Sequence, residues 1–286
     1  MKATIEKTGK IGKINKMTHD AYLAHEALSA SQVKLLLDNP HLFLRKEPMV
    51  QTPDMLLGSV IHSLVLEPES FDTIYAVMPK LDARTKAGKE EKQAFEEAHE
   101  GKVILTDALF DTAQSCAEAI TSSSANALLQ NGVAEASFFG QLEGYDAKCR
   151  PDYYCRERSL IIDIKKTTDA SPEGFTRADA NFKYYIQAAW YLDVLKSIGE
   201  PVKDFLFIAV EATAPFMVGI YRLADSAIEF GRLKYREALK TYRNINDFAK
   251  PIYRDTETRK YIQTIDLPAY VYAQNKNSNL MEVYHG

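Results

Sequence analysis

Cysteine is scarce in this chain of 286 residues, which contains only Cys116, Cys149 and Cys155. Three cysteines are too few for the disulfide framework of a small secreted domain, and they are one short of a four-cysteine zinc or iron–sulfur site. The sequence therefore predicts a protein of a reduced, cytoplasmic compartment.

Long apolar runs are also missing. The longest notable run, Phe205 to Val210, is far shorter than the roughly 18 residues that a membrane-spanning helix needs. The lysine-rich N-terminus has no apolar stretch behind it and does not predict a secretory signal. We expect no membrane span and no export.

The chain has no excess of basic charge, because 35 Lys and Arg residues stand against 39 Asp and Glu residues, for a formal net charge of −4. Bulk charge therefore does not indicate a nucleic-acid-binding protein, and any such function must depend on local basic patches. With 46% hydrophobic and 26% charged residues, the composition is that of a globular protein and excludes a disordered tail, a collagen-like fibre and a coiled-coil rod.

The first third of the chain predicts helices, because apolar residues recur at helical spacing between capping and helix-breaking residues. Ser31 would cap the first helix and Pro40 would end it. The other helices are expected from Thr52-Pro53 to just before Pro68, over 85–100 and over 106–130.

The middle of the chain changes to the shorter period of β-strands. We expect the first three strands to form an antiparallel meander, followed by one long helix, two more strands and a final helix. The strands are predicted at 134–143, 147–154, 159–165, 204–211 and 216–223, and the helices at about 179–198 and 225–244.

This order of elements predicts an α/β (α+β) fold, in which a mixed central β-sheet is flanked by helices, and not a series of alternating βαβ units. Neither repeats nor low-complexity linkers divide the chain. We expect a basic N-terminal arm at 1–19, which is either mobile or in contact with phosphate, a single domain at 20–250 and a tyrosine-rich C-terminal extension at 251–286.

Asp163 and Lys165 form the main candidate for chemistry. In a strand they project to one face, while Ile162 and Ile164 project into the core on the other. Such a pair is either an ordinary ion pair at a strand edge or the charged part of an active site. Antiparallel pairing of the preceding strand would place Asp152 beside Asp163, where two carboxylates repel unless a cation lies between them. Hard oxygen ligands of this kind suit Mg²⁺ or Mn²⁺.

Two helices offer further candidates. Gly58 and His62 lie one turn apart, so the glycine would let another element come close and His62 is either a core histidine or a third metal ligand. Lys183, Gln187 and Tyr191 are spaced by four and would form a polar stripe, which is either solvated or turned towards the same site.

The order of these motifs resembles the RecB-like branch of the PD-(D/E)XK nuclease superfamily, in particular the RecE-type exonucleases and their phage relatives. The similarity covers residues from about 20 to 245, and it includes the segments Leu28 to Gln32, Leu57 to Glu69 and Arg84 to Glu91. One departure is Asp163, which stands where the superfamily often has Glu. The cysteines that hold an iron–sulfur cluster in some RecB-like nucleases are absent.

The resemblance implies a restriction-endonuclease-like core and assigns a role to each candidate. It implies that the divalent cation, Mg²⁺ with Mn²⁺ as a substitute, is held by His62, Asp152, Asp163 and the Ile164 carbonyl. Lys165 would be the catalytic lysine. Supporting roles at the catalytic site would fall to Gln187, Tyr191 and, by the loosest match, Glu135.

The resemblance further implies an exonuclease that digests linear double-stranded DNA from 5′ to 3′ and leaves 3′ tails for a RecT-like single-strand annealing partner. It also implies a homo-oligomer, such as a ring-shaped tetramer around DNA. A structure-specific endonuclease and a catalytically inactive recombination scaffold remain alternatives. Candidate DNA-binding residues are Arg84, Lys86, Lys89, Lys166 and Lys183.

Overall fold

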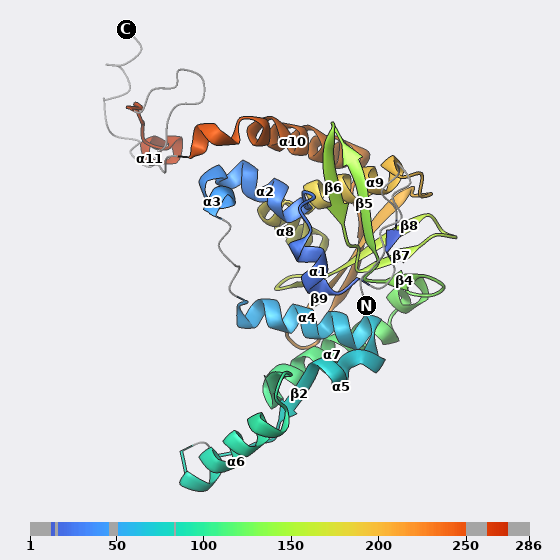
Figure 1. Ribbon diagram of the computed structural model, residues 1–286, viewed down its shortest axis with the longest axis vertical. Helices are drawn as coiled ribbons and strands as arrows, with labels where there is room; N and C mark the ends of the chain where they lie inside the picture. The colour runs from blue at the N-terminus through green and yellow to red at the C-terminus, as the bar shows by residue number, and fades with distance from the viewer. Residues whose placement is uncertain (1–12, 15–16, 46–50, 83, 250–261, 274–286) are drawn as a thin grey trace. The chain divides into compact units, whose positions relative to one another are not determined.

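The computed structural model describes residues 13–14, 17–45, 51–82, 84–249 and 262–273 (Figure 1). Contacts divide the chain into two units, 1–245 and 246–286. In the second unit the described residues include the short helix α11 (Ala269–Ala273). The first unit contains every candidate site residue.

A five-stranded mixed sheet, in the order β10-β9-β8-β7-β4, forms the centre of the first unit. β8 and β9 are parallel, and the other neighbours are antiparallel. This confirms the predicted mixed central sheet. Its strands are β4 (Val133–Ala134), β7 (Tyr153–Cys155), β8 (Leu160–Thr167), β9 (Asp204–Glu211) and β10 (Val218–Arg222).

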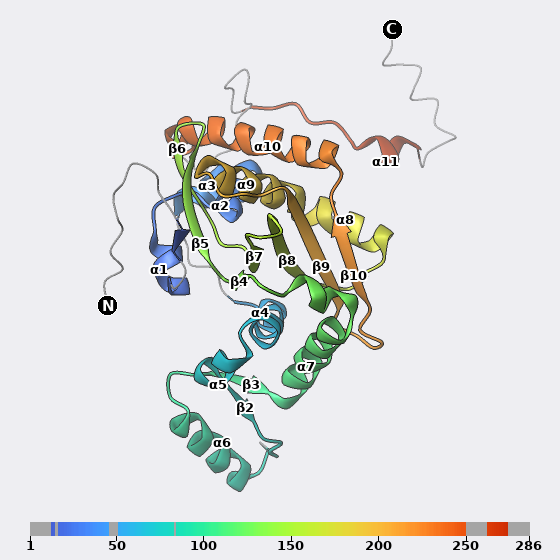
Figure 2. The same cartoon turned by 90° about the vertical axis from the view of Figure 1, so that its right-hand side faces the viewer.

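Helices cover both faces of this sheet (Figure 2). On one face α9 (Tyr184–Ser197) packs with α2 (Ala30–Asp38) and α10 (Asp225–Arg243), and the opposite face is covered by α4 (Pro53–Leu66) and α7 (Asp107–Ser122). Alternation along β8 sends Ile161, Asp163 and Lys165 to the α9 face. Ile162 and Ile164 pack on the α4 face, as predicted.

Smaller elements complete the first unit. A second sheet has the order β1-β5-β6, so part of the predicted basic arm, the strand β1, pairs with β5. In both views α6 lies at the end of its region, away from the central sheet (Figures 1 and 2). The remaining elements of the first unit are β1 (Lys13–Ile14), α1 (His19–Ala24), α3 (Pro40–Arg45), η1 (Pro68–Ser70), α5 (Phe71–Ile74), β2 (Tyr75–Met78), α6 (Lys86–Ala98), β3 (Val103–Thr106), η2 (Ser124–Leu128), β5 (Ser137–Leu142), β6 (Tyr145–Cys149) and α8 (Pro172–Phe182). The 3₁₀ helix η3 (Ile245–Phe248) starts at the last residue of this unit.

The predicted three-stranded meander is wrong. The segment expected as one strand at 147–154 is two strands, β6 and β7, which belong to different sheets. The break falls at Arg150-Pro151-Asp152, where proline offers no backbone N–H to a ladder. The short β7 that results leaves the second half of β8 without a strand neighbour on that side.

The predicted long helix at 179–198 is also wrong. Lys183 has a left-handed backbone, with φ +54°, and separates α8 from α9. Asp179 stabilises the break, because its Oδ1 accepts a hydrogen bond of 2.7 Å from the Tyr185 N–H at the start of α9. Lys183 therefore does not share a helical stripe with Gln187 and Tyr191.

Helix boundaries differ elsewhere in smaller ways. The cap of α2 is Ser29 and not Ser31, because Ser29 and Gln32 form a reciprocal capping box. α7 ends at Ser122 and is followed by the 3₁₀ helix η2, so the helix predicted to 130 is too long. The predicted helix starts at Thr52-Pro53 and at 106 are confirmed, because Thr52 caps α4 and Thr106 caps α7.

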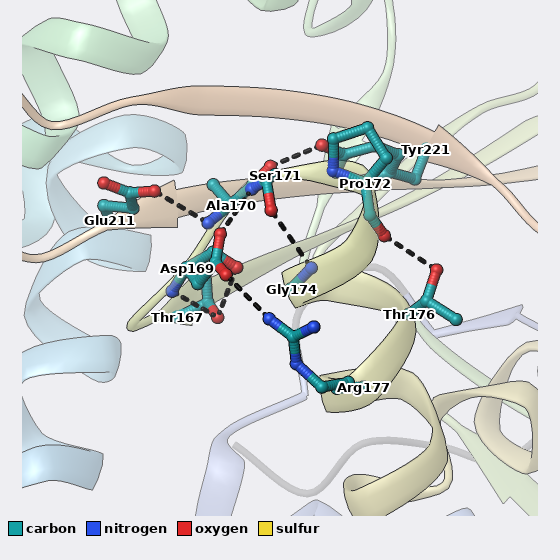
Figure 3. A network of polar contacts seen from close by, with 10 residues as sticks. All are labelled: Thr167, Asp169, Ala170, Ser171, Pro172, Gly174, Thr176, Arg177, Glu211 and Tyr221. Carbon is teal, nitrogen blue, oxygen red and sulfur yellow. Dashed lines mark hydrogen bonds and ion pairs between the residues drawn. The ribbon is translucent and has the colours of Figure 1, made fainter.

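The loop after β8 is tied to the sheet by a network of polar contacts (Figure 3). Asp169 accepts hydrogen bonds from the Ser171 N–H at 2.9 Å and from Arg177 Nη2 at 3.0 Å. The Ala170 N–H donates to Glu211 Oε1 of β9 at 2.8 Å, and the Tyr221 hydroxyl of β10 donates to the Ala170 carbonyl. Ser171 then caps α8. The network fixes the path along which the chain leaves β8.

Candidate active site

Because β7 begins only at Tyr153, opposite Ile162, the backbone N–H of Ile164 on β8 has no hydrogen-bond partner on that strand. In the register of this pair Tyr153 faces Ile162, so that Asp152 comes opposite Asp163 just before β7 begins. This is the register that the sequence predicts. In place of a strand partner, the Ile164 N–H donates to Asp152 Oδ2 at 2.6 Å. Asp152 is thereby oriented by the strand on which Asp163 and Lys165 lie.

His62 approaches the same point from α4. Its Nε2 lies 2.9 Å from the Ile164 carbonyl oxygen and 3.6 Å from Asp152 Oδ2. Burial, and after it the charge of Lys165, lowers the pKa of His62, so the neutral imidazole is favoured. A neutral imidazole is the form that binds a metal ion.

Gly58, one turn before His62, does not serve the role predicted for it. A Cβ atom added at Gly58 would meet no atom within 4 Å. No described element therefore packs closely against this glycine, and the predicted close approach is wrong.

Glu135 completes the acidic side of the site from the segment between β4 and β5. Its N–H donates to the Asp152 carbonyl at 3.0 Å, and its Oε2 accepts from Arg150 Nε at 2.7 Å. His62, Glu135 and Asp152 each bring one potential ligand atom within 4.8 Å of the others. Burial, followed by the charge of Asp152, raises the pKa of Glu135 to about 7.

Asp163 lies next to this group but is turned towards α9. It is 1% exposed, its Oδ1 accepts from Gln187 Nε2 at 2.6 Å, and its other oxygen forms an ion pair with Lys165. Gln187, expected to support the site, is thus in direct contact with Asp163. The closest group of metal-ligand type contains Glu135 in place of Asp163, so shared binding of one ion by both aspartates stays a prediction.

Charge is unbalanced across the site. Burial, and then the charge of Asp163, raises the pKa of Asp152 well above its usual range. For Lys165, burial favours the neutral amine, but the two aspartates outweigh it and raise the pKa. Lys165 is therefore a cation at neutral pH, while the carboxylates around Asp152 are costly to ionise without a further positive charge.

The donor set fits a hard divalent cation. It consists of the His62 imidazole, the Asp152 and Glu135 carboxylates and the Ile164 carbonyl. Ligand atoms about 2.1 Å from a six-coordinate Mg²⁺ lie roughly 3 Å from their neighbours, which is similar to the 2.9 and 3.6 Å separations around His62 Nε2. These residues can hold Mg²⁺ or Mn²⁺ after small movements.

Tyr191, predicted with Gln187, packs near Phe205 at a ring-centroid distance of 6.0 Å. Burial, followed by the charges of Tyr22 and Asp163, raises its pKa well above the usual range, so the hydroxyl keeps its proton. Tyr191 therefore lies beside the site as a neutral side chain.

Lys34 and Tyr184 were missed by sequence reasoning. The ammonium groups of Lys34 and Lys165 lie 5.4 and 5.1 Å from the centroid of the Tyr184 ring. The sequence did contain a signal for Lys34. It follows the buried Val33 and lies on the side of α2 where the helical period predicts apolar residues.

The predicted DNA-binding residues do not gather at one place. Lys166 and Lys183 flank the site, but each forms an ion pair, with Asp54 of α4 and with Asp38 of α2. The other three, Arg84, Lys86 and Lys89, lie at or just before the start of α6, away from the central sheet in both views (Figures 1 and 2). Their contact with DNA stays a prediction.

Among the helices that the structure describes, none has both the length and the apolar character needed to cross a membrane.

One comparison with known proteins identifies the family. A family model described as a PDDEXK-like domain of unknown function (DUF3799) matches residues 29–262. No curated protein matches the chain.

Two solved structures are similar in fold to different degrees. A protein from Eubacterium rectale named "Putative exonuclease" is 16% identical, with 92% of this chain and 99% of that chain covered and a TM-score of 0.60. A phage-related exonuclease from Haemophilus somnus is 13% identical, with 80% and 99% covered, and its TM-score of 0.34 is too low to support an argument. At this identity the first likeness shows the fold alone.

The family model covers every element that carries the site, from α2 through α4 and β8 to α9. The chain therefore belongs to the PDDEXK-like family and has the fold of the PD-(D/E)XK nucleases, as its resemblance to the RecE-type members of that superfamily predicted.

Proposed function

We propose that the protein is a Mg²⁺-dependent exonuclease that degrades linear double-stranded DNA from 5′ to 3′ and leaves 3′ single-stranded tails. The observation that carries this proposal is the convergence of His62, Asp152 and the Ile164 carbonyl beside the Asp163–Lys165 pair. A cluster of hard ligands next to a buried, charged lysine is what phosphodiester hydrolysis needs.

A divalent ion held by His62, Asp152, Glu135 and the Ile164 carbonyl would polarise the scissile phosphate and lower the pKa of a bound water. Asp163 lies beside these ligands and keeps Lys165 in place.

Lys165 is suited to an electrostatic role. Its raised pKa keeps it protonated, so it can neutralise charge that develops on a phosphate oxygen but cannot remove a proton from water. Gln187 holds one oxygen of Asp163 and leaves the other to Lys165, so that α9 sets the direction of the ammonium group. The Tyr184 ring lies against Lys165 on another side.

The choice of an exonuclease rests on the resemblance to RecE-type enzymes and on the name of the Eubacterium rectale protein that shares the fold. The same resemblance supports a homo-oligomer and transfer of the 3′ tails to a single-strand annealing protein. The three free, buried cysteines support action in the reducing cytoplasm of a bacterium, for a protein encoded by the bacterium or by a phage.

The test compares linear duplex DNA with covalently closed circular DNA of the same sequence, in Mg²⁺ and in excess chelator. We expect nucleotides to be released from the linear form alone, in Mg²⁺ alone, with the 5′-labelled end lost first. Cutting of the closed circle would show an endonuclease instead. Absence of any cleavage would leave a DNA-binding scaffold as the function.

A further inference from the structure

Within the part of the chain that the structure describes, Lys34 of α2 differs from the other lysines near the site in having no anionic or carbonyl partner. Among the residues that the structure describes, its one recorded contact is with the face of the Tyr184 ring, at 5.4 Å from Nζ to the centroid. In contrast, Lys165 pairs with Asp163, Lys166 with Asp54 and Lys183 with Asp38.

The buried Lys148 shows how this protein satisfies a lysine that serves the fold. Its Nζ donates to the carbonyls of Tyr22, Leu23 and His25 at 2.6, 3.3 and 2.7 Å, so all three donors are used. Lys34 is half-buried and has no such set of acceptors. Burial of an ammonium group without a polar partner destabilises the folded state, so a structural role does not explain Lys34.

The surroundings of Lys34 place it at the active site. The ammonium groups of Lys34 and Lys165 both lie near the Tyr184 ring, so the two nitrogens can be no further apart than the sum of their distances to its centroid. One turn after Lys34, Asp38 pairs with Lys183 at the break between α8 and α9, which holds this face of α2 against the start of α9.

Charge indicates what is missing. Burial, followed by repulsion from Lys165, lowers the pKa of Lys34 to about 7, and the attraction of Asp163 and Asp179 does not offset this. An anion bound next to Lys34 would reverse that balance. The proposed substrate carries one negative charge per phosphodiester, spaced regularly along each strand.

We propose that Lys34 is a substrate-binding residue that holds an internal phosphodiester of the bound DNA, adjacent to the phosphate that faces Lys165. This inference rests on the proposed function, because it takes DNA as the occupant of the site. Both ammonium groups contact the Tyr184 ring, which would limit their spacing to one that suits neighbouring phosphates. Lys34 would contribute to binding in the ground state, whereas Lys165 acts on the reacting phosphate.

The test is a comparison of Lys34→Met, which keeps the length of the side chain and removes its charge, with Lys34→Arg, which keeps the charge. Lys203→Ala, at an exposed position before β9, is the matched control for loss of one lysine. Binding of a labelled duplex is measured by fluorescence anisotropy over a salt series with Ca²⁺ in place of Mg²⁺. Cleavage kinetics are measured in Mg²⁺ on duplexes with a 5′-phosphate and with a 5′-hydroxyl.

For Lys34→Met we expect Kd and KM to rise by about ten- to a hundredfold, which is the range for loss of a charge-assisted hydrogen bond. The slope of log K against log salt should fall by about 0.9, as for one phosphate contact, and kcat should change little. Lys34→Arg should keep the slope, and Lys203→Ala should match the wild type. The loss should be the same for both 5′ ends.

An unchanged Kd and salt slope in Lys34→Met would overturn the inference, as would a fall in kcat without a change in Kd. A loss confined to 5′-phosphorylated DNA would show a terminal phosphate as the ligand and would also overturn it. If the wild type cleaves DNA and Lys34→Met has the same Kd, salt slope and cleavage kinetics, only this inference fails. If the wild type neither binds nor cleaves DNA, the proposed function fails with it.

Discussion

Two polar clusters lie along the same strand, β8, and their carboxylates have opposite electrostatic environments. After the end of β8, hydrogen bonds from Ser171, and then the charge of Arg177, lower the pKa of Asp169 (Figure 3). Beside the middle of β8, burial and the charge of Asp163 raise the pKa of Asp152. The surroundings of Asp169 favour its ionised form without help, and those of Asp152 do not.

This difference separates a structural network from a functional one. In the loop after β8, the Asp169 carboxylate accepts hydrogen bonds from donors of the chain itself, and the network ends at Ser171, which caps α8. In the cluster of His62, Glu135 and Asp152, Arg150 pairs with Glu135 and Lys165 pairs with Asp163, so among the described residues no Lys or Arg forms an ion pair with Asp152. A cation from outside the chain resolves the imbalance.

The largest expected effect is on catalysis. Asp163→Asn and Lys165→Met should each lower the rate of DNA cleavage by at least about a thousandfold, because Lys165 neutralises charge on the reacting phosphate and Asp163 holds it in place. DNA binding should survive in both variants. The rate is measured by release of nucleotides from labelled linear duplex in Mg²⁺.

Asp169→Asn is the matched control from the other cluster and should cleave at the wild-type rate. Full activity in Asp163→Asn or in Lys165→Met would show that the reaction takes place elsewhere. A loss in Asp169→Asn as large as theirs would remove the distinction between the two clusters.

A smaller effect is expected on the pH dependence of stability. The pKa of Glu135 is raised from 4.5 to about 7 in the folded state, so the folded chain holds this proton more tightly than the unfolded chain. The protonated Glu135 carboxyl stabilises the folded state fully below pH 4.5, and this contribution is lost as pH rises to about 7. The free energy of unfolding should fall by about 2 kcal/mol over this range, after allowance for partial solvent exposure. Urea unfolding in chelator, measured from pH 4.5 to 8, checks it.

Mg²⁺ should reduce this loss, because the ion binds the ionised carboxylates of the folded state. Glu135→Gln should make the stability less dependent on pH in chelator. A wild-type stability that is constant over this range, with and without Mg²⁺, would contradict the charge imbalance.

The smallest expected effect is in the loop after β8. Ser171→Ala removes the side chain that accepts from the Gly174 N–H at 3.1 Å and caps α8. We expect a loss of about 1 kcal/mol in the free energy of unfolding, with cleavage unchanged. Urea unfolding and the nuclease assay on one preparation measure both, and a large loss of cleavage would show that this cap also shapes the site.

The part of the site that could be placed from sequence lies on, or directly beside, the regular strand β8. Alternation along residues 159–165 correctly separates Asp163 and Lys165 from the core, and pairing around the turn correctly places Asp152 opposite Asp163. The mixed sheet followed from the order of the elements.

What could not be predicted depends on breaks and long-range packing. Pro151 separates β6 from β7, so the Ile164 N–H pairs with the Asp152 side chain and not with a strand. The left-handed backbone of Lys183 divides one helical pattern into two helices. Neither break changes the apolar period around it. Lys34 comes to the site through the packing of α2 on α9, which local sequence does not specify.

The most direct test of the account is a crystal of the protein soaked in Mn²⁺ and examined for anomalous density. We expect a peak in contact with His62, Asp152 and the Ile164 carbonyl, with Glu135 close by, and no peak at Asp169. Absence of density at the first position under saturating Mn²⁺, or a peak at Asp169 alone, would contradict the claim that the cluster beside the middle of β8 is a metal-dependent active site.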